Sequence, residues 1–281
     1  MQQRPHGAWR SPLSSAAIVA ETVALSDTQI DGDGVVWQEG RPGEKGRVTL
    51  LRRAADGSVS ELTPAPFNVR TRVHEYGGRS YLVAGHSMFF SHFADQRLYR
   101  SDGAGAARAI TPDVAQAALR YVDLQYDAAH DRLYAVREDH RAGGEAVNAL
   151  VLLNALGDEV GGTVVAGGCD FYCAPRLSPD GQHLAWIQWR HPNMPWDRTE
   201  LMLAPVHADG SLGAAQCVAG GVAESVCQPL WSPIGELHFV SDKGGWWNLT
   251  RWRAGQAQNL TPAGRRVRPA ALELRRQQLC L

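Results

Sequence analysis

The segment Pro175-Arg-Leu-Ser-Pro-Asp-Gly181 has a near copy further along the chain, Pro229-Leu-Trp-Ser-Pro-Ile-Gly235. In each copy an apolar run enters a Ser-Pro turn, a glycine closes the turn, and a second apolar run follows, His183–Ile187 in one case and Glu236–Val240 in the other. Proline and glycine supply the backbone angles that tight turns need. The pair therefore predicts one β-hairpin that is used twice, which is evidence for an internal repeat.

Strand-like runs of this kind recur along the whole chain and are rich in aromatic and β-branched residues. The five predicted second strands of the repeat are Gly34–Gln38, Ser87–Ser91, Arg132–Val136, His183–Ile187 and Glu236–Val240. Each is followed by another run with an apolar centre. The five predicted third strands are Arg47–Leu51, Gln96–Tyr99, Asn148–Leu152, Thr199–Leu203 and Trp247–Thr250.

Every repeat also ends in a similar way, on Thr-Pro or Gly-Gly, and these residues stop or weaken a strand. The five closing segments are Leu62–Pro64, Ile110–Pro112, Val165–Gly168, Val218–Gly221 and Leu260–Pro262. A period of roughly 40–55 residues with four strands per unit is typical of propeller blades. The sequence therefore predicts an all-β fold, a β-propeller of about five four-stranded blades.

The predicted propeller spans residues 1–262, with blades at roughly 18–64, 71–112, 118–168, 169–221 and 224–262. The pattern stops after Pro262. Residues 263–281 contain five arginines and follow a helical pattern from Ala270 onward. Either a frameshift or premature stop gives this divergent tail, or a short helix caps the fifth blade. The abrupt change favours truncation.

Composition limits the classes of partner. With 281 residues, 44% hydrophobic and 20% charged, the chain is long and apolar enough to form a globular core. A formal net charge of −1 gives no reason to expect nucleic acid or an anionic membrane as a partner. No apolar run is long enough to span a bilayer, and Ala16–Ala20 is too short for the core of a signal peptide. A cytoplasmic location is predicted.

The cysteines predict neither a disulfide framework nor a metal site. There are five, and they lack the paired C-x-x-C spacing of zinc ligands. They are Cys169, Cys173, Cys217, Cys227 and Cys280. They are interpreted as small apolar residues buried on strands, and no metal and no cofactor is predicted.

Longer segments resemble the N-terminal propeller of the prolyl oligopeptidase family, in its acylaminoacyl-peptidase and dipeptidyl-aminopeptidase-like branch. They are Asn68–Gly78, Phe93–Tyr99, His191–Asp197 and Ser241–Asn248, and Pro5–Ala20 is similar to the usual start of that branch. The resemblance runs from about the first residues to Pro262. In that family a propeller of usually seven or so blades covers an α/β-hydrolase domain with a serine, aspartate and histidine triad. The resemblance thus implies an incomplete propeller whose catalytic domain is absent.

A catalytic serine is not predicted in this chain. The nearest match to the G-x-S-x-G nucleophile elbow is Gly85-His-Ser-Met-Phe89, where Phe89 replaces the final glycine. An elbow also requires a strand-turn-helix setting, whereas the surroundings of Ser87 predict strand-turn-strand. We interpret Ser87 as a strand residue, predict no catalytic residues, and expect the chain alone to be inactive. Whether it is part of an enzyme is left open.

The candidate substrate-binding residues are Arg72, His74, Glu75 and Tyr76 in the first resembling segment, together with Trp196. Arg72 and His74 are candidates for a peptide carboxylate or carbonyl group, and Glu75 for a substrate amine. In the structural alternative, which we favour, Glu75 pairs with Arg72 and Tyr76 packs between blades. Trp196, on the loop between the second and third strands of the fourth blade, is the tryptophan most expected to be exposed.

Three functions are compatible with these features. The first is a non-catalytic, substrate-gating propeller of a serine peptidase-like protein, which binds short peptides when joined to a catalytic domain. The second is a stand-alone propeller that binds a protein or peptide. The third is a metal-dependent enzyme with ligands such as Glu75, Asp123 and Asp170, although no spacing singles these residues out. An open array of blades is also expected to self-associate through its exposed edges.

Overall fold

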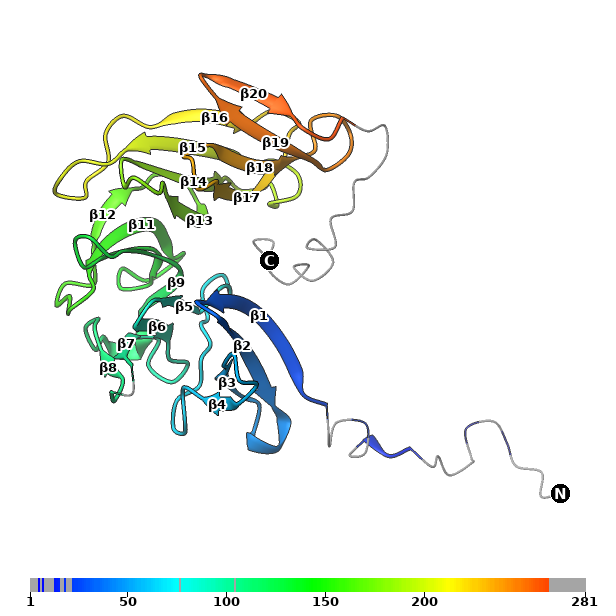
Figure 1. Cartoon of the computed structure of the whole chain (residues 1–281), viewed down its shortest axis with the longest axis vertical. Helices are drawn as coiled ribbons and strands as arrows, with labels where there is room; N and C mark the ends of the chain where they lie inside the picture. Colours follow the sequence, from blue (N-terminus) through cyan, green and yellow to red (C-terminus); the bar gives the residue numbers. More distant parts are fainter. Residues whose placement is uncertain are drawn as a thin grey trace. The chain divides into compact units, whose positions relative to one another are not determined.

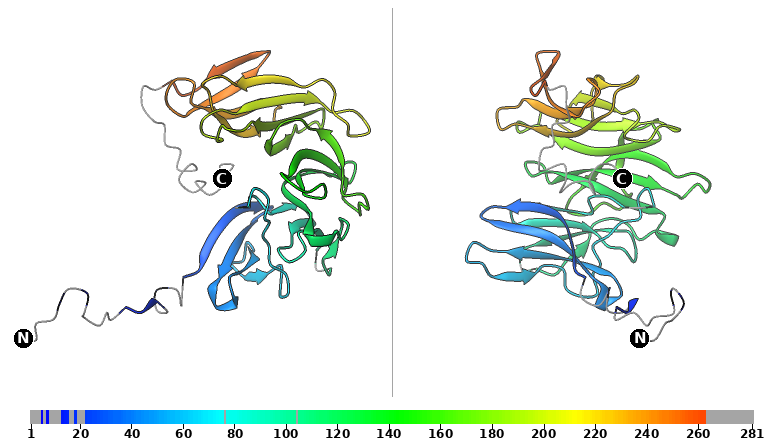
Figure 2. Two further views of the ribbon diagram at one scale, coloured as in Figure 1. Left: turned by 180° about the vertical axis from the view of Figure 1, so that it is seen from behind. Right: turned by 90° about the vertical axis from the view of Figure 1, so that its right-hand side faces the viewer.

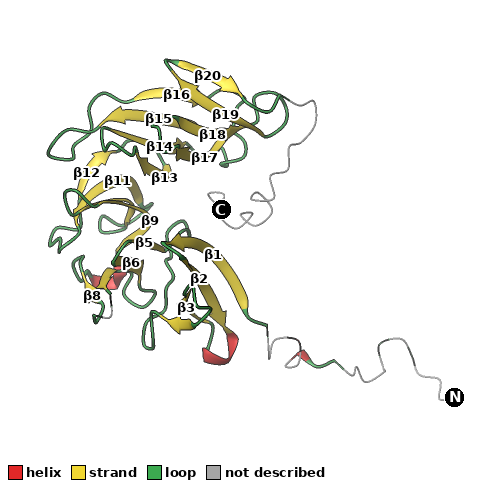
Figure 3. Ribbon diagram, in the orientation of Figure 1, coloured by secondary structure: helices red, strands yellow, loops and turns green. Residues whose placement is uncertain are grey.

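The computed structural model describes residues 22–75, 77–103 and 105–262, together with residues 5, 7, 13–15 and 18. It contains five four-stranded antiparallel sheets, formed in sequence order (Figure 1). Strands and the loops between them make up nearly all of the described chain (Figure 3). The predicted fold class, an incomplete β-propeller, is confirmed. Tyr76 and the predicted tail, residues 263–281, lie outside the described residues.

Each sheet is a simple meander of consecutive strands. The first consists of β1 (Ala24–Asp31), β2 (Gly34–Arg41), β3 (Arg47–Arg53) and β4 (Val59–Glu61). The second consists of β5 (Tyr81–Ala84), β6 (Ser87–Ser91), β7 (Leu98–Asp102) and β8 (Arg108–Ala109). The third consists of β9 (Leu119–Asp127), β10 (Arg132–Asp139), β11 (Val147–Asn154) and β12 (Thr163–Ala166). The fourth consists of β13 (Phe171–Leu177), β14 (His183–Trp189), β15 (Glu200–Pro205) and β16 (Gln216–Gly220). The fifth consists of β17 (Val226–Trp231), β18 (Leu237–Ser241), β19 (Asn248–Arg253) and β20 (Gln256–Asn259).

The sheets belong to two compact units that meet in sequence between Asn68 and Val69. The first unit contains the first sheet, and the second unit contains the other four. Two short 3-10 turns, Pro42–Glu44 and Ala115–Ala117, interrupt the loops. No helix in the described ranges is long and apolar enough to cross a membrane.

One predicted strand begins later than expected. The run Gln96–Tyr99 was predicted as a third strand, but β7 starts at Leu98. Gln96 lies in the preceding turn with a φ of +60°. Its buried side-chain amide accepts a hydrogen bond from the backbone nitrogen of Arg72, 2.7 Å away. The Gln96 side chain therefore holds the backbone of the connection that contains Arg72. Gln96 itself lies in a turn and is not part of the β7 ladder.

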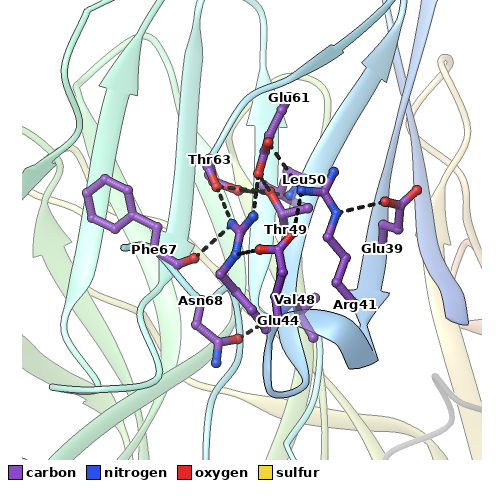
Figure 4. A network of polar contacts seen from close by, with 11 residues as sticks. Glu39, Arg41, Glu44, Val48, Thr49, Leu50, Glu61, Thr63, Phe67 and Asn68 are labelled. Atoms are coloured by element: carbon purple, nitrogen blue, oxygen red, sulfur yellow. Dashed lines mark hydrogen bonds and ion pairs between the residues drawn. The ribbon is translucent and has the colours of Figure 1, made fainter. Parts of the chain in front are cut away.

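The Thr-Pro closures have a structural role that goes beyond stopping a strand. In the first sheet the Thr63 hydroxyl accepts a hydrogen bond from the backbone nitrogen of Leu50, 2.8 Å away (Figure 4). Thr111 does the same for Leu98 at 3.0 Å, and Thr261 for Leu249 at 3.0 Å. The hydroxyl thus continues the ladder where proline offers no N–H group.

The third and fourth sheets use Gly-Gly at this position, and in the fourth sheet the geometry explains why. Gly220 has a φ of +91°, a conformation that side chains disfavour, and a Cβ atom there would lie 2.0 Å from the carbonyl oxygen of Thr199. The neighbouring Gly221 donates its backbone N–H to the same carbonyl at 2.9 Å. A larger residue at position 220 would push the last strand away from its neighbour.

The core of the second unit consists of three clusters of side chains, each between two successive sheets. Figure 2 shows the backbone of these sheets from two further sides. Alternation along β10 shows the principle: Leu133 and Ala135 belong to the cluster with the second sheet, while Tyr134 and Val136 belong to the cluster with the fourth. Trp186 and Trp189 on β14 are 2% and 3% exposed. Large aromatic side chains therefore fill the space between these sheets.

The first strand of four sheets contains a β-bulge that the sequence did not indicate. The bulged residues have positive φ angles although none is glycine, and they are Asp27, Asp123, Ala174 and Gln228. In the second unit the Asp123 carboxylate accepts a hydrogen bond from the backbone nitrogen of Ala174 at 2.9 Å. This bulge thus links two neighbouring first strands.

The meander gives every sheet two different ends. We call one the turn end: it carries the turns between first and second strands and between third and fourth strands. We call the other the loop end: it carries the loops between second and third strands and the connections between sheets. In the fourth sheet the turn end contains the turns at Asp180-Gly181 and Asp209-Gly210, while the loop end contains the longer segment of residues 190–199.

Three cysteines have free thiols within the described residues, and two of the three are buried as the sequence predicted. Cys169 and Cys227 are buried, whereas Cys217 on β16 is exposed. Burial raises the pKa of the Cys227 thiol to about 12, so that thiol is protonated at neutral pH.

Candidate functional site

A cavity of about 910 Å³ opens at the loop end of the second unit. Its lining comes from the connection before the second sheet, from the loop ends of the third and fourth sheets, and from the segment between those two sheets. The lining residues are His74, Glu75, Glu138, His140, residues 144–148, residues 168–171, Trp189 and residues 191–195. Two of the family-like segments, Asn68–Gly78 and His191–Asp197, therefore contribute to one site.

Glu138 is the centre of a polar network beside the cavity. Its carboxylate is 5% exposed and accepts a hydrogen bond from the backbone nitrogen of His74 at 3.0 Å. The guanidinium group of Arg120 lies 3.1 Å away and the Nε2 atom of His140 lies 3.0 Å away. A buried carboxylate with these partners fixes the first family-like segment against the third sheet.

Glu75 is the solvent-exposed member of this network. Its side chain is 79% exposed and pairs with Arg120 at 2.9 Å, so the partner is Arg120 and not Arg72. This hydrogen bond holds the pKa of the Glu75 carboxyl group below its usual value. Arg120 also donates to the backbone oxygen of Arg72, at 3.1 Å. The network therefore holds both the side chain and the backbone of this segment.

His74 packs inward against aromatic residues. Its ring lies 5.6 Å from the ring of Phe171, edge to face, and 6.1 Å from that of Trp189. Burial lowers the pKa of the His74 imidazole, and the charges of Glu138 and Asp123 act in the opposite direction. Phe171 and Trp189 stack on each other at 5.2 Å. The cavity thus has one aromatic wall.

The other predicted site residues lie near the cavity or apart from it. Arg72 is not in the lining, and its guanidinium carbon lies 5.8 Å from the ring centre of Phe93. Trp196 is 49% exposed on the predicted loop, one residue beyond the last lining residue, Pro195. The structure therefore brings His74 and Glu75 together in the cavity lining, whereas Arg72 and Trp196 lie outside that lining.

Several lining residues were missed by sequence reasoning. Asn148 was predicted only as part of a strand, Glu145 and Phe171 were not singled out, and Asp170 was named only as a metal candidate. The usable signal was their position, because each of them lies at or just before the start of a strand at the loop end of a sheet. Loops at one end of a rigid scaffold are where binding residues commonly gather.

The nucleophile and metal alternatives gain no support from the described residues. Ser87 is the first residue of strand β6, and its hydroxyl donates to Asp102 at 2.7 Å, which confirms the prediction of a strand serine. Asp170 accepts a hydrogen bond from the backbone nitrogen of His191 at 2.9 Å, and Asp123 and Glu75 have the partners given above. Within the described ranges no group of three or more His, Cys, Asp or Glu residues is arranged to hold a metal ion.

The repeated four-stranded sheets and their shared interfaces define the chain as a set of propeller blades. No protein-family model matches the chain, and no curated protein matches it. Solved structures do match. A puromycin-hydrolyzing peptidase from Mycobacterium tuberculosis is 40% identical over 94% of this chain, with a TM-score of 0.83. A puromycin hydrolase is 35% identical over 94% of this chain, also with a TM-score of 0.83.

This chain spans only 42% and 43% of the length of those two proteins. A prolyl endopeptidase matches 86% of the chain at 13% identity and a TM-score of 0.60, which shows a shared fold. The resemblance predicted from the motifs is therefore confirmed for the propeller: the chain is similar to the propeller portion of puromycin-hydrolyzing peptidases, and it shares its fold with prolyl oligopeptidases.

Proposed function

We propose that this chain is the substrate-gating propeller of a hydrolase that cleaves amide bonds in short peptides or aminoacyl compounds. The single observation that carries the proposal is the identity of 35–40% with puromycin hydrolases across almost the whole chain. The cavity supports it, because family-like segments line it. In this proposal the propeller selects and orients the ligand, and residues outside the described chain perform the chemistry.

The physical basis of gating is the shape and composition of the site. A cavity of about 910 Å³ falls within the range of small-ligand pockets. Its aromatic wall can hold an apolar side chain, while its carboxylates and amide groups can orient a peptide backbone. The residues of the cavity would position a bound ligand and would not cleave it. Binding energy that positions a ligand lowers the barrier of a reaction that other residues catalyse.

The experiment compares ligand binding in a variant with a filled cavity and in a matched control. Ala146 lines the cavity at the loop end, and Ala208 is exposed at the turn end of the fourth sheet. By titration calorimetry, puromycin and the tripeptide phenylalanyl-alanyl-alanine should bind the unmodified chain. Ala146→Trp should weaken both at least about tenfold by occupying the site, and Ala208→Trp should leave both unchanged. A folded chain that binds neither ligand would refute the proposal.

A stand-alone binding propeller is the second candidate. The observation that favours it is that every described residue lining the cavity lies between positions 74 and 195, within one compact unit. Full affinity for the tripeptide in the isolated chain, with no increase when a peptidase catalytic domain is supplied, would favour this candidate over the gating role.

Self-association is a further part of the proposal. On the last sheet Leu230 is 48% exposed and Leu249 is 39% exposed. Apolar groups in such positions favour contact with another sheet. Light scattering across a range of protein concentrations tests this, and Leu249→Lys should shift the population towards monomer.

The cytoplasmic location also remains a proposal. Fractionation of the producing cells tests it, and recovery of the chain outside the cytoplasmic fraction would overturn it.

A further inference from the structure

Two arginines of the second unit contact one aromatic ring at the loop end of the second sheet. Arg70 and Arg72 lie in the connection that precedes β5, and Phe93 lies in the loop between β6 and β7. The guanidinium carbon of Arg70 is 4.6 Å from the centre of the Phe93 ring, and that of Arg72 is 5.8 Å from it. Both distances are in the range of a cation–π contact. We call Arg70, Arg72 and Phe93 the arginine cluster.

The two arginines of the cluster have no paired carboxylate within the described chain. Neither guanidinium group forms an ion pair or a hydrogen bond with a described residue, and the Nε atom of Arg72 is buried without a partner. Asp95, in the same loop as Phe93, already accepts hydrogen bonds from the Tyr99 hydroxyl at 2.7 Å and from the backbone nitrogen of Arg97 at 3.1 Å. The cluster therefore carries positive charge that no contact within the described chain neutralises.

The contacts with the ring leave the donors of both arginines available to an anion. A guanidinium group over an aromatic ring uses its face, so the N–H groups along its edge can still donate to a carboxylate in the bidentate manner. Both groups lie near the same ring centre, so they are at most about 10 Å apart, which is comparable to the Debye length at 0.1 M salt. Their repulsion is therefore only partly screened, and a bound anion would relieve it.

The surroundings of the cluster favour a carboxylate on a polypeptide over a small free anion. The cluster lies outside the cavity lining, and Arg70 is exposed. Small ligands are usually bound in concave sites, whereas arginine and aromatic side chains on an open surface are typical of protein interfaces. The formal net charge of the whole chain is −1, so the chain as a whole does not attract acidic polypeptides. Binding of an acidic segment would therefore report this cluster and not the overall charge.

We propose that the arginine cluster is a docking site for an acidic segment of a partner polypeptide, whose aspartate or glutamate side chains pair with Arg70 and Arg72 while Phe93 holds both guanidinium groups in place. This inference does not depend on the proposed function, because none of the three residues lines the cavity. Arg70 and Arg72 belong to the same connection as His74 and Glu75, which do line it. A partner docked on the cluster would thus lie beside the cavity without occupying it.

The test uses the full chain and two fluorescently labelled hexapeptides with blocked ends. The acidic peptide alternates glutamate with alanine, and the amide peptide has glutamine in place of each glutamate. Fluorescence anisotropy measures both affinities. The acidic peptide should bind at least about tenfold more tightly than the amide peptide, because charge-assisted hydrogen bonds are the stronger ones. Added salt should weaken its binding, as expected for ion pairs at an exposed site.

Variants of the cluster locate the binding site. Arg70→Gln and Arg72→Gln should each weaken binding of the acidic peptide about fivefold or more. Phe93→Leu keeps both charges and should weaken it about twofold to fivefold, because it removes only the cation–π contacts. Arg53→Gln is the matched control. Arg53 is an exposed arginine at the turn end of the first sheet, so this variant makes the same change of charge away from the cluster and should bind normally.

Three results would overturn the inference. They are equal binding of the two peptides, an equal loss in Arg70→Gln and Arg53→Gln, and displacement of the acidic peptide by acetate or phosphate at about 1 mM, which would make the cluster a site for small anions. If Arg72→Gln does not fold, judged by circular dichroism, Arg70→Gln and Phe93→Leu still decide the case. None of these results affects the gating proposal, because that proposal is tested with ligands of the cavity.

Discussion

The turn end and the loop end of the fourth sheet are formed by the same strands, yet they differ in how their polar groups are satisfied. At the turn end the Ser178 hydroxyl donates to Asp180 and accepts from the backbone nitrogen of His183 at 2.9 Å. The hydrogen-bonding groups of this turn therefore find their partners within the turn. At the loop end the backbone oxygen of Asp170 accepts a hydrogen bond from Asn148 of the third sheet, whose Oδ1 acceptor has no partner among the described residues. The comparison teaches that the turn end satisfies its polar groups locally, whereas the loop end leaves a polar group available to a ligand.

The largest expected effect comes from the buried network at the loop end. Glu138→Ala should lower the free energy of unfolding by about 3–5 kcal/mol, because Arg120 and the His74 backbone lose a buried partner. Urea denaturation of the purified chain measures this. The exposed turn-end variant Glu159→Ala should change stability by less than about 0.5 kcal/mol. Similar costs for the two variants would mean that the loop-end network has no special structural role.

Ser178→Ala tests whether the turn end contributes to stability alone. The substitution leaves the backbone N–H group of His183 without its acceptor, so stability should fall by about 1–3 kcal/mol. Affinity for the tripeptide should stay within about twofold, because the cavity is formed by the other end. A loss of affinity in a chain that is still folded would break the division between the two ends.

Glu75→Ala should have a small effect on stability. The sequence interpretation placed Glu75 in a buried pair, but its side chain is 79% exposed and its partner is Arg120. A surface ion pair of this kind contributes about 0–1 kcal/mol. Thermal unfolding of Glu75→Ala beside Glu75→Gln measures the difference. A cost near that of Glu138→Ala would show that Glu75 is part of the buried network after all.

The smallest effect is a dependence of stability on pH at His74. Burial holds the pKa of His74 in the folded chain below the value of about 6.5 in the unfolded chain. As the pH falls below about 6.5, the unfolded chain therefore takes up a proton that the folded chain does not, and stability falls until the folded pKa is reached. The carboxylates of Glu138 and Asp123, the rings of Phe171 and Trp189 and the backbone of Tyr172 face this imidazole.

The measurement for His74 is the slope of unfolding free energy against pH in the unmodified chain and in His74→Asn. Asparagine is chosen because it tolerates the positive φ of 54° at this position. The slope between about pH 6.5 and the folded pKa should be smaller in the variant. Identical slopes would show that His74 remains able to take up its proton in the folded chain.

The sequence predicted the fold well because each strand carries its own local signal. All five predicted third strands and all five predicted second strands overlap the observed ones, since alternating apolar residues must face the two neighbouring sheets. Gln96 was assigned to a strand because nothing local shows that its amide binds the backbone of Arg72. The bulges at Asp123 and Ala174 were missed because their positive φ angles occur without glycine.

The site was predicted only in part. His74 and Glu75 lie in the lining, and they were found because they belong to a recognisable segment. Asn148 comes from the third repeat and Asp170 and Phe171 from the fourth, and each looks like an ordinary strand or loop residue in sequence. Only the three-dimensional arrangement shows that one amide oxygen of Asn148 is left without a donor. A property that depends on a missing contact has no sequence signature.

Mapping of the bound tripeptide by amide chemical shifts is the most direct test of the contrast between the two ends. On titration of phenylalanyl-alanyl-alanine into the isotope-labelled chain, the amide signals of Asn148, Phe171 and Trp189 should shift, since these residues line the loop-end cavity. The signals of Gly181 and Gly210 in the turns should remain in place. Shifts confined to the turn end, or none at either end at saturating peptide, would contradict the account.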